Sequence, residues 1–436
     1  MRDESRKQGK AKADSERFKN SLKFYFLCGE IMGINNNMLI ELARKYGTPL
    51  YVYDGNLIIQ RYNELYNFIK WPKLKIFYAM KANYNFAILK LLNENKAYLD
   101  TVSPGEVLLA LRAGFTPDRI LYTANNMTDE EVKYVKSLGV LFNIDSISRL
   151  ERYGRIFSGD KICLRFNPNV VAGAHKKIQT GGDLTKFGIL LKDIEKVKSI
   201  VKKFNLKVVG LHEHTGSGIS ETEKIMQSMR NTLNIAKKEN FPDLQFIDFG
   251  GGFQVPYKPN DKRIDYRSFG TKISKIFSDF CQEYGRELEL YFEPGRYIVA
   301  ESGYLIVEVN TIKDNNSRLI AGTNSGFPQL IRPVFYDAYH HITNLSNPQG
   351  KIKKYDICGN ICETGDCFAV QREMPEIREG DLLAIQNAGA YCYSMGGIYN
   401  LRAMPAEVLV LKGKGKLVRK RLTNEELINQ IIGESR

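Results

Sequence analysis

A lysine stands directly after a run of residues that is typical of a buried strand. The run, 76–80, reads Ile-Phe-Tyr-Ala-Met, and Lys81 follows it. Because an unpaired lysine is almost never fully buried, the local sequence alone favours a strand that leaves the core and a lysine that reaches solvent. The alternative is an amine held at a fixed point, where burial would lower its pKa and make it nucleophilic at neutral pH.

Three later segments carry groups that bind anions. In 249–253, Phe-Gly-Gly-Gly-Phe, the glycines follow a strand-like run, and their backbone N–H groups can approach a phosphate closely. The segment 293–296, Glu-Pro-Gly-Arg, adds a guanidinium, and 212–218, His-Glu-His-Thr-Gly-Ser-Gly, adds imidazoles and hydroxyls. Three glycines alone could be a flexible turn, so the segments count only together as a candidate anion site.

An amine, a phosphate site and a buried carboxylate together predict pyridoxal phosphate as the cofactor. The lysine would hold it as a Schiff base, glycines would bind its phosphate, and a carboxylate would keep its pyridine nitrogen protonated. His212 and His214 could instead bind a metal, because alternate residues of a strand point the same way. The chain has only five histidines and no third soft ligand at a useful spacing, so we expect no metal site.

These groups belong to a chain that alternates between strand-like and helix-like segments from about residue 76. The strand-like runs are KIFYAMKA, YLDTVS, RILYTAN, LFNID, ICLRFN, VVGLHEH, LQFIDFG and LELYFEPGRY. Such alternation predicts a parallel α/β sheet, and eight units that close on themselves form a (β/α)8 barrel of the TIM type. An open doubly wound sheet is the rival, but no Gly-x-Gly-x-x-Gly follows the first strand.

Polar residues stand at the carboxyl ends of the predicted strands, where barrel enzymes place their chemistry. They are Lys81, Asp100, Asn125, Asp145, Arg165, Asn167, His214, Asp248, Gly250, Gly251, Gly252, Glu293 and Arg296. We therefore expect them to converge on one rim of the barrel. For Asn125 and Asp145 the simpler interpretation is that they cap the helices that follow.

The segments outside the barrel predict a second, β-rich domain. After the last barrel strand the runs GYLIVEVNTIKD, LLAIQNAG and AEVLVLKG are separated by turns, and a helical pattern is scarce until the end of the chain. We predict a barrel over 56–297, an antiparallel C-terminal β domain over 298–436, and strands in 24–55 that join the β domain. The segment 1–23 has the low hydrophobicity of a disordered basic tail.

The composition is that of an ordinary globular protein, with 43% hydrophobic and 26% charged residues and no apolar run long enough to span a bilayer. The formal charge of +14 suggests nucleic-acid binding, but the lysines are spread along amphipathic helices. Seven cysteines without a Cys-x-x-Cys pair argue against a disulfide framework and for a reducing cytoplasm. We therefore expect a cytoplasmic protein with no nucleic-acid and no membrane partner.

Seven motifs in this order resemble those of a known family, the fold-type III pyridoxal-phosphate decarboxylases. They are YAMKAN, VSPGE, GLHEHTGSG, DFGGGF, EPGRY, CETGD and NAGAY. Within that family they are most similar to the diaminopimelate decarboxylases, and the resemblance covers roughly residues 24–432. It implies an architecture like that of alanine racemase and ornithine decarboxylase, with pyridoxal phosphate bound in the barrel.

The resemblance implies roles for residues of the barrel. Lys81 would bind the cofactor covalently, Asp100 would lie near its amine, and His214 would stack on the cofactor ring. Glu293 would pair with the pyridine nitrogen. The residues that would hold the phosphate and its surroundings are Ser217, Gly250, Gly251, Gly252, Gly295 and Arg296.

The same resemblance implies that the β domain completes the site. Cys362 matches the family's proposed proton donor, and Tyr391 matches a residue that touches both cofactor and substrate. The expected catalytic set is thus Lys81, Asp100, His214 and Cys362. Because the family builds its sites at a homodimer interface, Cys362 and Glu363 would reach the active site of the second subunit.

The choice of substrate depends on few residues. Arg332 and Tyr336 match positions that bind the distal carboxylate of diaminopimelate, and Glu363 matches the acid that binds the distal amino group. Arg296 and Tyr391 complete the expected substrate set. Lysine and ornithine have no distal carboxylate, so Arg332 discriminates between the substrates. The expected reaction is the decarboxylation of meso-2,6-diaminopimelate to L-lysine, the last step of lysine biosynthesis.

Two alternatives stay open at this point. One is a related decarboxylase that acts on lysine, ornithine or a carrier-linked amino acid. The other is a non-catalytic regulatory homologue, which the intact Lys81, Cys362 and Tyr391 argue against. One departure from the family is Thr364, which replaces the usual serine of the Cys-Glu-Ser-x-Asp motif and adds a methyl group beside the distal end of the substrate.

Overall fold

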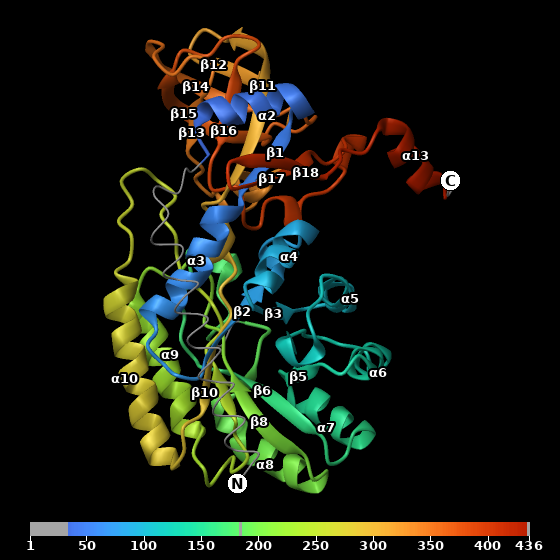
Figure 1. Cartoon of the computed structure of the whole chain (residues 1–436), viewed down its shortest axis with the longest axis vertical. Coiled ribbons are helices and arrows are strands. Elements are labelled where there is room, and N and C mark those ends of the chain that lie inside the picture. Colours follow the sequence, from blue (N-terminus) through green and yellow to red (C-terminus); the bar gives the residue numbers. More distant parts are fainter. Residues whose placement is uncertain (1–33, 183–184, 434–436) are drawn as a thin grey trace.

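Eight parallel strands close into a barrel in the computed structural model, which describes residues 34–182 and 185–433 (Figure 1). The strands are β2 (Leu74–Ala79), β3 (Tyr98–Thr101), β4 (Ile120–Tyr122), β5 (Leu141–Ile144), β6 (Lys161–Asn167), β8 (Lys207–His212), β9 (Phe246–Asp248) and β10 (Glu289–Phe292). They pair in the order β5-β4-β3-β2-β10-β9-β8-β6, and β5 also pairs with β6, which closes the ring. The predicted barrel is confirmed, and the two-residue strand β7 (Ile189–Leu190) extends it beside β6.

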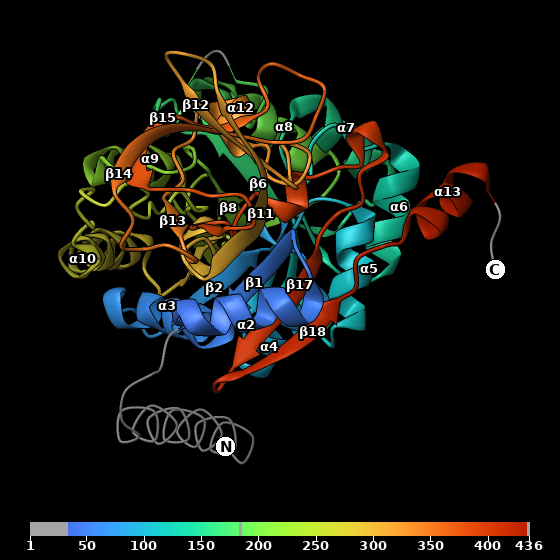
Figure 2. The ribbon, with the colours of Figure 1, turned by 90° about the horizontal axis from the view of Figure 1, so that it is seen from above.

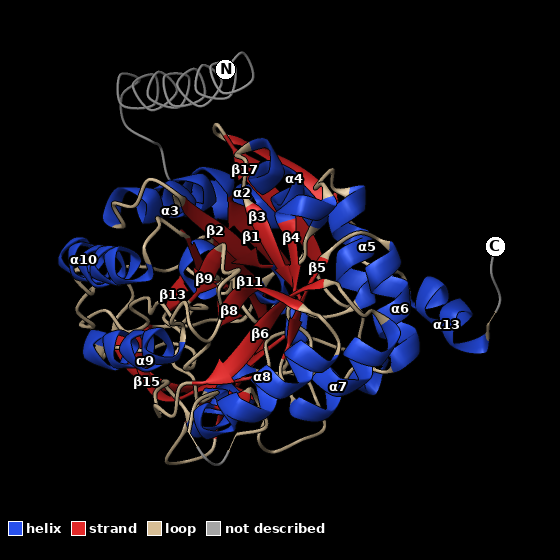
Figure 3. Cartoon of the chain, turned by 90° about the horizontal axis from the view of Figure 1, so that it is seen from below, coloured by secondary structure: helices blue, strands red, loops and turns tan. Residues whose placement is uncertain are grey.

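Helices surround the barrel because each presents an apolar stripe to the strands (Figure 3). In the longest one, Phe269, Ile273 and Phe277 are buried at intervals of four residues. The helices are α3 (Gly55–Phe68), α4 (Phe86–Glu94), α5 (Pro104–Arg112), α6 (Asp129–Ser137), α7 (Ile147–Ile156), α8 (Ile194–Lys203), α9 (Thr222–Ile235) and α10 (Tyr266–Tyr284).

The helices that follow β4 and β5 begin at hydroxyl caps. The Thr128 hydroxyl accepts a backbone N–H at the start of α6, and the Ser146 hydroxyl does so at the start of α7. The expectation that Asn125 and Asp145 cap these helices is therefore wrong. Both residues precede the cap, and Asp145 instead faces the guanidinium of Arg165.

The interior of the barrel has an apolar layer and, toward the carboxyl ends of the strands, a polar layer. The apolar layer consists of Phe77, Leu121, Cys163, Val209, Phe246 and Tyr291. Alternate residues of a strand point to the same face. Asp248 and Glu293 therefore follow Phe246 and Tyr291 into the barrel, and both carboxyl groups are buried. The sequences of β9 and β10 thus place Asp248 and Glu293 above the apolar layer.

A second sheet lies beyond the carboxyl ends of the barrel strands (Figure 1). Its strands are β1 (Leu50–Asp54), β11 (Gly303–Asp314), β12 (Leu319–Thr323), β13 (Ile342–Asn344), β14 (Ile352–Cys358), β15 (Cys367–Pro375), β16 (Leu382–Ile385), β17 (Ala406–Leu411) and β18 (Lys414–Arg419). Most neighbouring strands pair antiparallel, as the sequence predicts, but β1 pairs with β17 and β12 with β14 in parallel. The sheet is mixed.

Short helices connect the two parts and flank the second sheet. They are α2 (Asn36–Tyr46), α11 (Arg296–Val299), α12 (Arg332–Tyr336) and α13 (Asn424–Ile432), the last of which projects from the body of the molecule (Figure 2). None of the helices in the described ranges has the length and apolar character that crossing a membrane requires. The predicted tail, 1–23, lies outside the described residues.

Candidate active site

A pocket lies at the carboxyl ends of the barrel strands. Its lining consists of Ala79, Lys81, His214, Ser217, Gly252, Phe253, Glu293, Gly295, Arg296 and Tyr391. All of these except Ala79 and Phe253 are residues that the sequence predicts for the site. They come from the ends of β2, β8, β9 and β10 and from the loop that follows β16.

Lys81 forms an ion pair with the fully buried carboxylate of Asp100, which β3 provides. Burial alone would lower the pKa of the Lys81 ammonium, but the charges of Asp100 and Glu293 outweigh it and raise the pKa above its usual value. The expected lowering of the lysine pKa is therefore wrong. The physical reason is that the sequence places two acids on neighbouring strand ends beside the amine.

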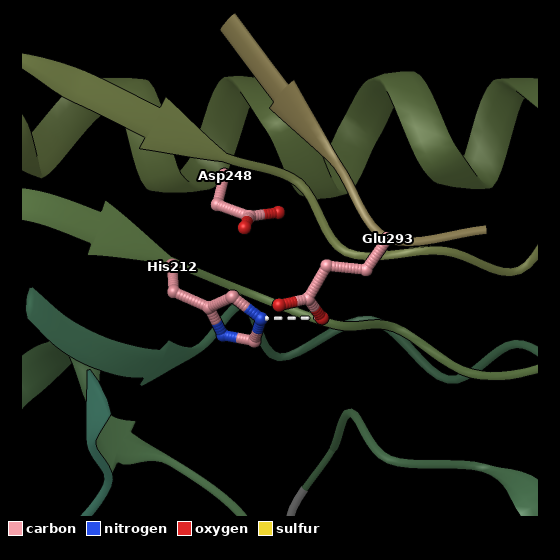
Figure 4. Close-up of side chains that lie close together, drawn as sticks. All are labelled: His212, Asp248 and Glu293. Atoms are coloured by element: carbon pink, nitrogen blue, oxygen red, sulfur yellow. Dashed lines mark hydrogen bonds and ion pairs between the residues drawn. The ribbon is translucent and has the colours of Figure 1, made fainter. Parts of the chain in front are cut away.

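A buried cluster of His212, Asp248 and Glu293 lies next to this ion pair (Figure 4). The Nε2 of His212 is 3.0 Å from a carboxylate oxygen of Glu293, and the hydroxyl of Thr123 donates to the other oxygen at 3.3 Å. Burial raises the pKa of Glu293, and burial together with the Glu293 charge raises that of Asp248 well above its usual range. A cationic group bound in the pocket would lower the raised pKa of the neighbouring carboxyl group and pair with its ionised form.

The ligand atoms of His212, Asp248 and Glu293 all lie within 4.8 Å of one another, close enough to share a metal ion. However, one oxygen of Asp248 already accepts the backbone N–H of Gly250 at 2.8 Å, and Glu293 also lines the pocket beside Lys81. The absence of a metal site stays a prediction from the sequence.

His214 is held by the glycine segment. Its Nδ1 accepts the backbone N–H of Gly251 at 3.1 Å, and its backbone carbonyl accepts the Thr180 hydroxyl at 2.6 Å. Burial, together with the charge of Arg165, lowers the pKa of His214 well below its usual value. The ring is thus neutral, with its proton on Nε2, and can lie against an aromatic ligand without a charge to desolvate.

The glycine segment packs too closely for side chains. A Cβ at Gly250 would lie 2.6 Å from the Nδ1 of His214, and one at Gly251 would lie 2.4 Å from the backbone oxygen of Glu293. Gly250 and Gly252 also have left-handed backbones, with φ of 62° and 99°. Glycine therefore brings this backbone against the elements that carry His214 and Glu293.

An anion subsite lies beside these glycines. Arg296 donates from Nη2 to the Ser217 hydroxyl at 3.1 Å and from Nη1 to the Tyr257 hydroxyl at 2.8 Å. Its Nε is buried and has no hydrogen-bond partner among the described residues. A guanidinium, a hydroxyl and a glycine backbone form a donor set that suits a phosphate. Together with the Lys81 amine and the Glu293 carboxyl, this set fits pyridoxal phosphate.

A second buried arginine lies next to this subsite. The Arg332 guanidinium carbon is 5.2 Å from the ring of Tyr257 and 5.8 Å from that of Tyr336. Its Nε donates to the Nε2 of His340 at 3.3 Å, and the Nδ1 of His340 donates to a backbone carbonyl at 2.8 Å. Arg332 is thus held in place with its charge beside the pocket.

Tyr257 and His340 belong to the site although no motif marks them. Tyr257 lies between Arg296 and Arg332, and His340 orients Arg332. Both residues are in loops, where neither strand nor helix periodicity applies. Only the proximity of Tyr257 to the glycine segment could have drawn attention to it.

Tyr391 reaches the pocket from a strained loop. Its backbone is left-handed, with φ of 57°, and its N–H donates to the carbonyl of Ala82, next to Lys81. The guanidinium carbon of Arg296 lies 5.1 Å from its ring. A non-glycine residue in this conformation costs about 1 kcal/mol or more, and such strain is common at binding sites.

Cys362 and Glu363 are not among the described residues that line the pocket. Both are exposed, in the loop between β14 and β15. The thiol of Cys362 lies 3.3 Å from the Oδ1 of Asn400, and Glu363 accepts the Tyr399 hydroxyl at 3.1 Å. The chain therefore does not bring them to its own Lys81.

A further polar cluster lies beside His214, on the side of the segment 212–218 that faces α9 rather than the pocket. Glu213 and Thr215 flank it in the sequence, and both point toward Ser228 of α9, away from the pocket. The carboxylate of Glu213 accepts the Ser228 hydroxyl at 2.6 Å and the Thr215 hydroxyl at 3.1 Å. Burial raises the pKa of Glu213 to about 7.

Comparison with known proteins gives a consistent result. Residues 56–300 match the family model of the pyridoxal binding domain of pyridoxal-dependent decarboxylases. The chain is 44% identical over 397 residues to diaminopimelate decarboxylase of Methanothermobacter thermautotrophicus, covering 89% of this chain and 92% of that protein. It is 37% identical over 402 residues to the Aquifex aeolicus enzyme of the same name, covering 90% and 93% of the two chains.

A solved structure agrees with these relatives. The crystal structure of diaminopimelate decarboxylase from Helicobacter pylori in complex with L-lysine superposes with a TM-score of 0.83 at 33% identity. The match covers 91% of this chain and 99% of that one.

Proposed function

Because this chain belongs to the family of pyridoxal-dependent decarboxylases, we propose that it removes carbon dioxide from diaminopimelate and releases L-lysine. The relatives of known name and the lysine-bound structure support this substrate and product. The observation that carries the substrate choice is Arg332, a buried cation that shares Tyr257 with Arg296 at the rim of the pocket.

The residues of the pocket would have different roles in the reaction. Pyridoxal phosphate, when bound, supplies an electron sink for the electron pair that remains when carbon dioxide leaves. Lys81 would hold the cofactor, and Glu293 would provide a negative charge for its ring nitrogen. Asp100, paired with Lys81, keeps the amine in position and takes part in its proton exchange.

The remaining pocket residues would hold and orient the cofactor. Its phosphate would lie between Arg296, Ser217 and the backbone of the segment 250–252. Gly295, which has no side chain, allows the end of β2 to lie close to the backbone that follows β10. The neutral His214 would lie against the ring, and Tyr391 would touch both cofactor and substrate.

Arg332 and Tyr336 would bind the far end of the substrate. Diaminopimelate carries an ammonium and a carboxylate at each end, so one end can react while the other is recognised. A buried guanidinium is suited to the distal carboxylate, and Glu363 to the distal ammonium. Lysine and ornithine carry no distal carboxylate, so as substrates they would leave Arg332 without an anionic partner.

We further propose that two copies of the chain form a homodimer that shares its active sites. Cys362, the proposed proton donor, and Glu363 are exposed and outside the pocket of their own chain, which supports a role in the second subunit. The neighbouring residues Ile398, Tyr399 and Leu401 expose 42%, 47% and 55% of their surface. Apolar side chains gathered beside functional groups are typical of a protein interface.

The domain division and the location of the protein also remain part of this proposal. The family match over 56–300 supports a cofactor-binding barrel over 56–297 and a β domain over 298–436. Free cysteines in the described part of the chain, Cys362 exposed among them, support a reducing cytoplasm.

One assay tests the function. Carbon dioxide release is measured from meso-diaminopimelate, L-lysine and L-ornithine with the holoenzyme, and Lys81→Ala is the catalytic control. We expect activity on diaminopimelate alone. For Arg332→Ala, kcat/KM should fall about 10- to 100-fold, because a hydrogen bond to a charged group contributes about 1.5–3 kcal/mol. Arg332→Lys should lie between the two, since lysine keeps the charge without the bidentate geometry.

Activity on lysine or ornithine without activity on diaminopimelate would overturn the substrate assignment. Unchanged kinetics of Arg332→Ala would overturn only the role of Arg332 and would leave the reaction itself untouched.

A further inference from the structure

Two cysteines face each other at the base of the loop that carries Cys362 and Glu363. Cys358 ends β14, Cys367 begins β15, and the antiparallel pairing places them opposite each other. Their Sγ atoms are 2.9 Å apart. Facing residues of antiparallel strands have Cα atoms roughly 4.5–5.5 Å apart, which lies within the range that a disulfide spans.

The two thiols differ in their chemistry. The two sulfurs share a hydrogen bond in which either thiol can be the donor. When Cys358 donates, the contact lowers the pKa of the Cys367 thiol and raises that of the Cys358 thiol. The guanidinium of Arg318 also favours the Cys367 thiolate, while burial and the charges of Asp356 and Asp366 oppose it. Both side chains are partly exposed, and a small reagent can therefore reach them. Cys367 is thus the better nucleophile of the pair.

We propose that Cys358 and Cys367 form a redox-active dithiol site that reacts with low-molecular-weight disulfides such as oxidised glutathione. The Cys367 thiolate attacks one sulfur of the oxidant, forms a mixed disulfide and releases one thiolate. Cys358 loses its proton to solvent and its sulfur attacks the Cys367 sulfur, which releases the second thiolate, and the released thiolates take up protons from solvent. Two electrons pass from the protein to the oxidant, and the protein loses two hydrogen atoms as the new sulfur–sulfur bond forms.

The bond would close the loop 359–366 covalently. In the reduced protein this loop is held at its base by the Gly359 N–H, which donates to the Asp366 carbonyl at 2.8 Å. The Asp366 carboxylate also accepts the Ile361 N–H at 2.8 Å and the Phe327 N–H at 2.6 Å. A disulfide would add to these hydrogen bonds and restrict the opening of the loop. The formation of the disulfide does not depend on the proposed function. Only the effect of the closed loop on catalysis, through Cys362 and Glu363, rests on the proposed function.

Peptide mapping of the full-length holoenzyme tests the site. The protein is incubated with oxidised glutathione, alkylated and digested, and we expect a linked peptide pair that joins Cys358 to Cys367. Cys358→Ser and Cys367→Ser should each abolish the link, and Cys281→Ser, a buried thiol of α10, should leave it intact. The proposal is overturned if both thiols of the wild type remain open to alkylation, or if Cys362 is linked in place of either.

Hydrogen exchange measures the consequence for the loop. In the oxidised wild type the amides of 359–366 should exchange about tenfold more slowly than in the reduced protein, because the closed ring raises the free energy of local opening. The Cys358→Ser variant should show no such change on treatment with the oxidant. Equal exchange in both wild-type forms would overturn the restriction of the loop. Neither measurement uses decarboxylation, so failure here is distinguishable from failure of the proposed function.

Discussion

Glu213 is fully buried, and its carboxylate is satisfied on one oxygen only. Thr215 and Ser228 donate to Oε2, whereas Oε1 has no hydrogen-bond partner among the described residues. Burial outweighs the two hydrogen bonds and raises the pKa of the group from 4.5 to about 7. Glu213, which belongs to the segment that carries His214, therefore favours its neutral form in the folded protein.

This raised pKa predicts a pH-dependent stability. The neutral form is favoured in the folded protein, so the stabilising contribution is present below about pH 4.5 and is lost as the pH rises through about 7. A shift of this size corresponds to about 3 kcal/mol between the two limits. Urea denaturation at several pH values should show that Glu213→Gln, which cannot ionise, loses this part of the pH dependence.

The control for this prediction is Glu239→Gln, a change of the same kind at an exposed position. It should follow the wild type across the whole pH range. If Glu213→Gln also runs parallel to the wild type, Glu213 does not titrate in this window and the prediction fails.

At the scale of elements, the close approach of the ends of β9 and β10 depends on Gly251. A Cβ there would lie 2.4 Å from the backbone oxygen of Glu293, which cannot swing aside as a flexible side chain could. Gly251→Ala should therefore push the ends of β9 and β10 apart, at a cost of about 1–3 kcal/mol. The dissociation constant for pyridoxal phosphate, measured by absorbance titration, should rise about tenfold or more.

Gly105→Ala provides a matched substitution in the first turn of α5. An added Cβ there would meet only the Ser103 hydroxyl, at 3.8 Å, and the position is exposed. Cofactor affinity should not change in this variant. Equal affinities for the two glycine variants would show that the spacing at Gly251 does not matter for the cofactor.

The barrel could be predicted from the sequence because its signals are local. Each strand is a short apolar run followed by an amphipathic helix, and each polar residue occupies a strand end. The mixed pairing of the second sheet could not be predicted, because β1 and β17 are more than 350 residues apart in the chain and no local pattern records their direction. The strand β7 has only two residues and carries no period.

The candidate site, too, could be predicted from the sequence only in part. Lys81, His214, Glu293 and Arg296 were predictable from motifs at strand ends, and the pocket brings them together. Tyr257 and His340 were not, because their positions depend on how loops fold back on the barrel. The raised pKa of Lys81 also arises between elements, since Asp100 and Glu293 come from other strands.

At the scale of the whole molecule, the proposed homodimer would complete a site that one chain leaves without Cys362. The pocket is lined by the residues that we propose to bind the cofactor, whereas Cys362 lies exposed in a loop of the second sheet. The formal charge of +14 does not oppose the pairing of two chains, because basic residues are distributed over the helices that surround the barrel. A homodimer should sediment at about twice the chain mass of 49.8 kDa.

Mixing two inactive variants tests whether the sites are shared. Lys81→Ala and Cys362→Ala should each have little activity alone, because every site of either homodimer lacks one group. After unfolding and refolding together in equal amounts, half of the dimers should be hybrids, and each hybrid should contain one site with both groups intact. Activity should therefore recover to about a quarter of the wild-type value. If Cys362 acted on the Lys81 of its own chain, both sites of the hybrid would stay defective and mixing would restore nothing.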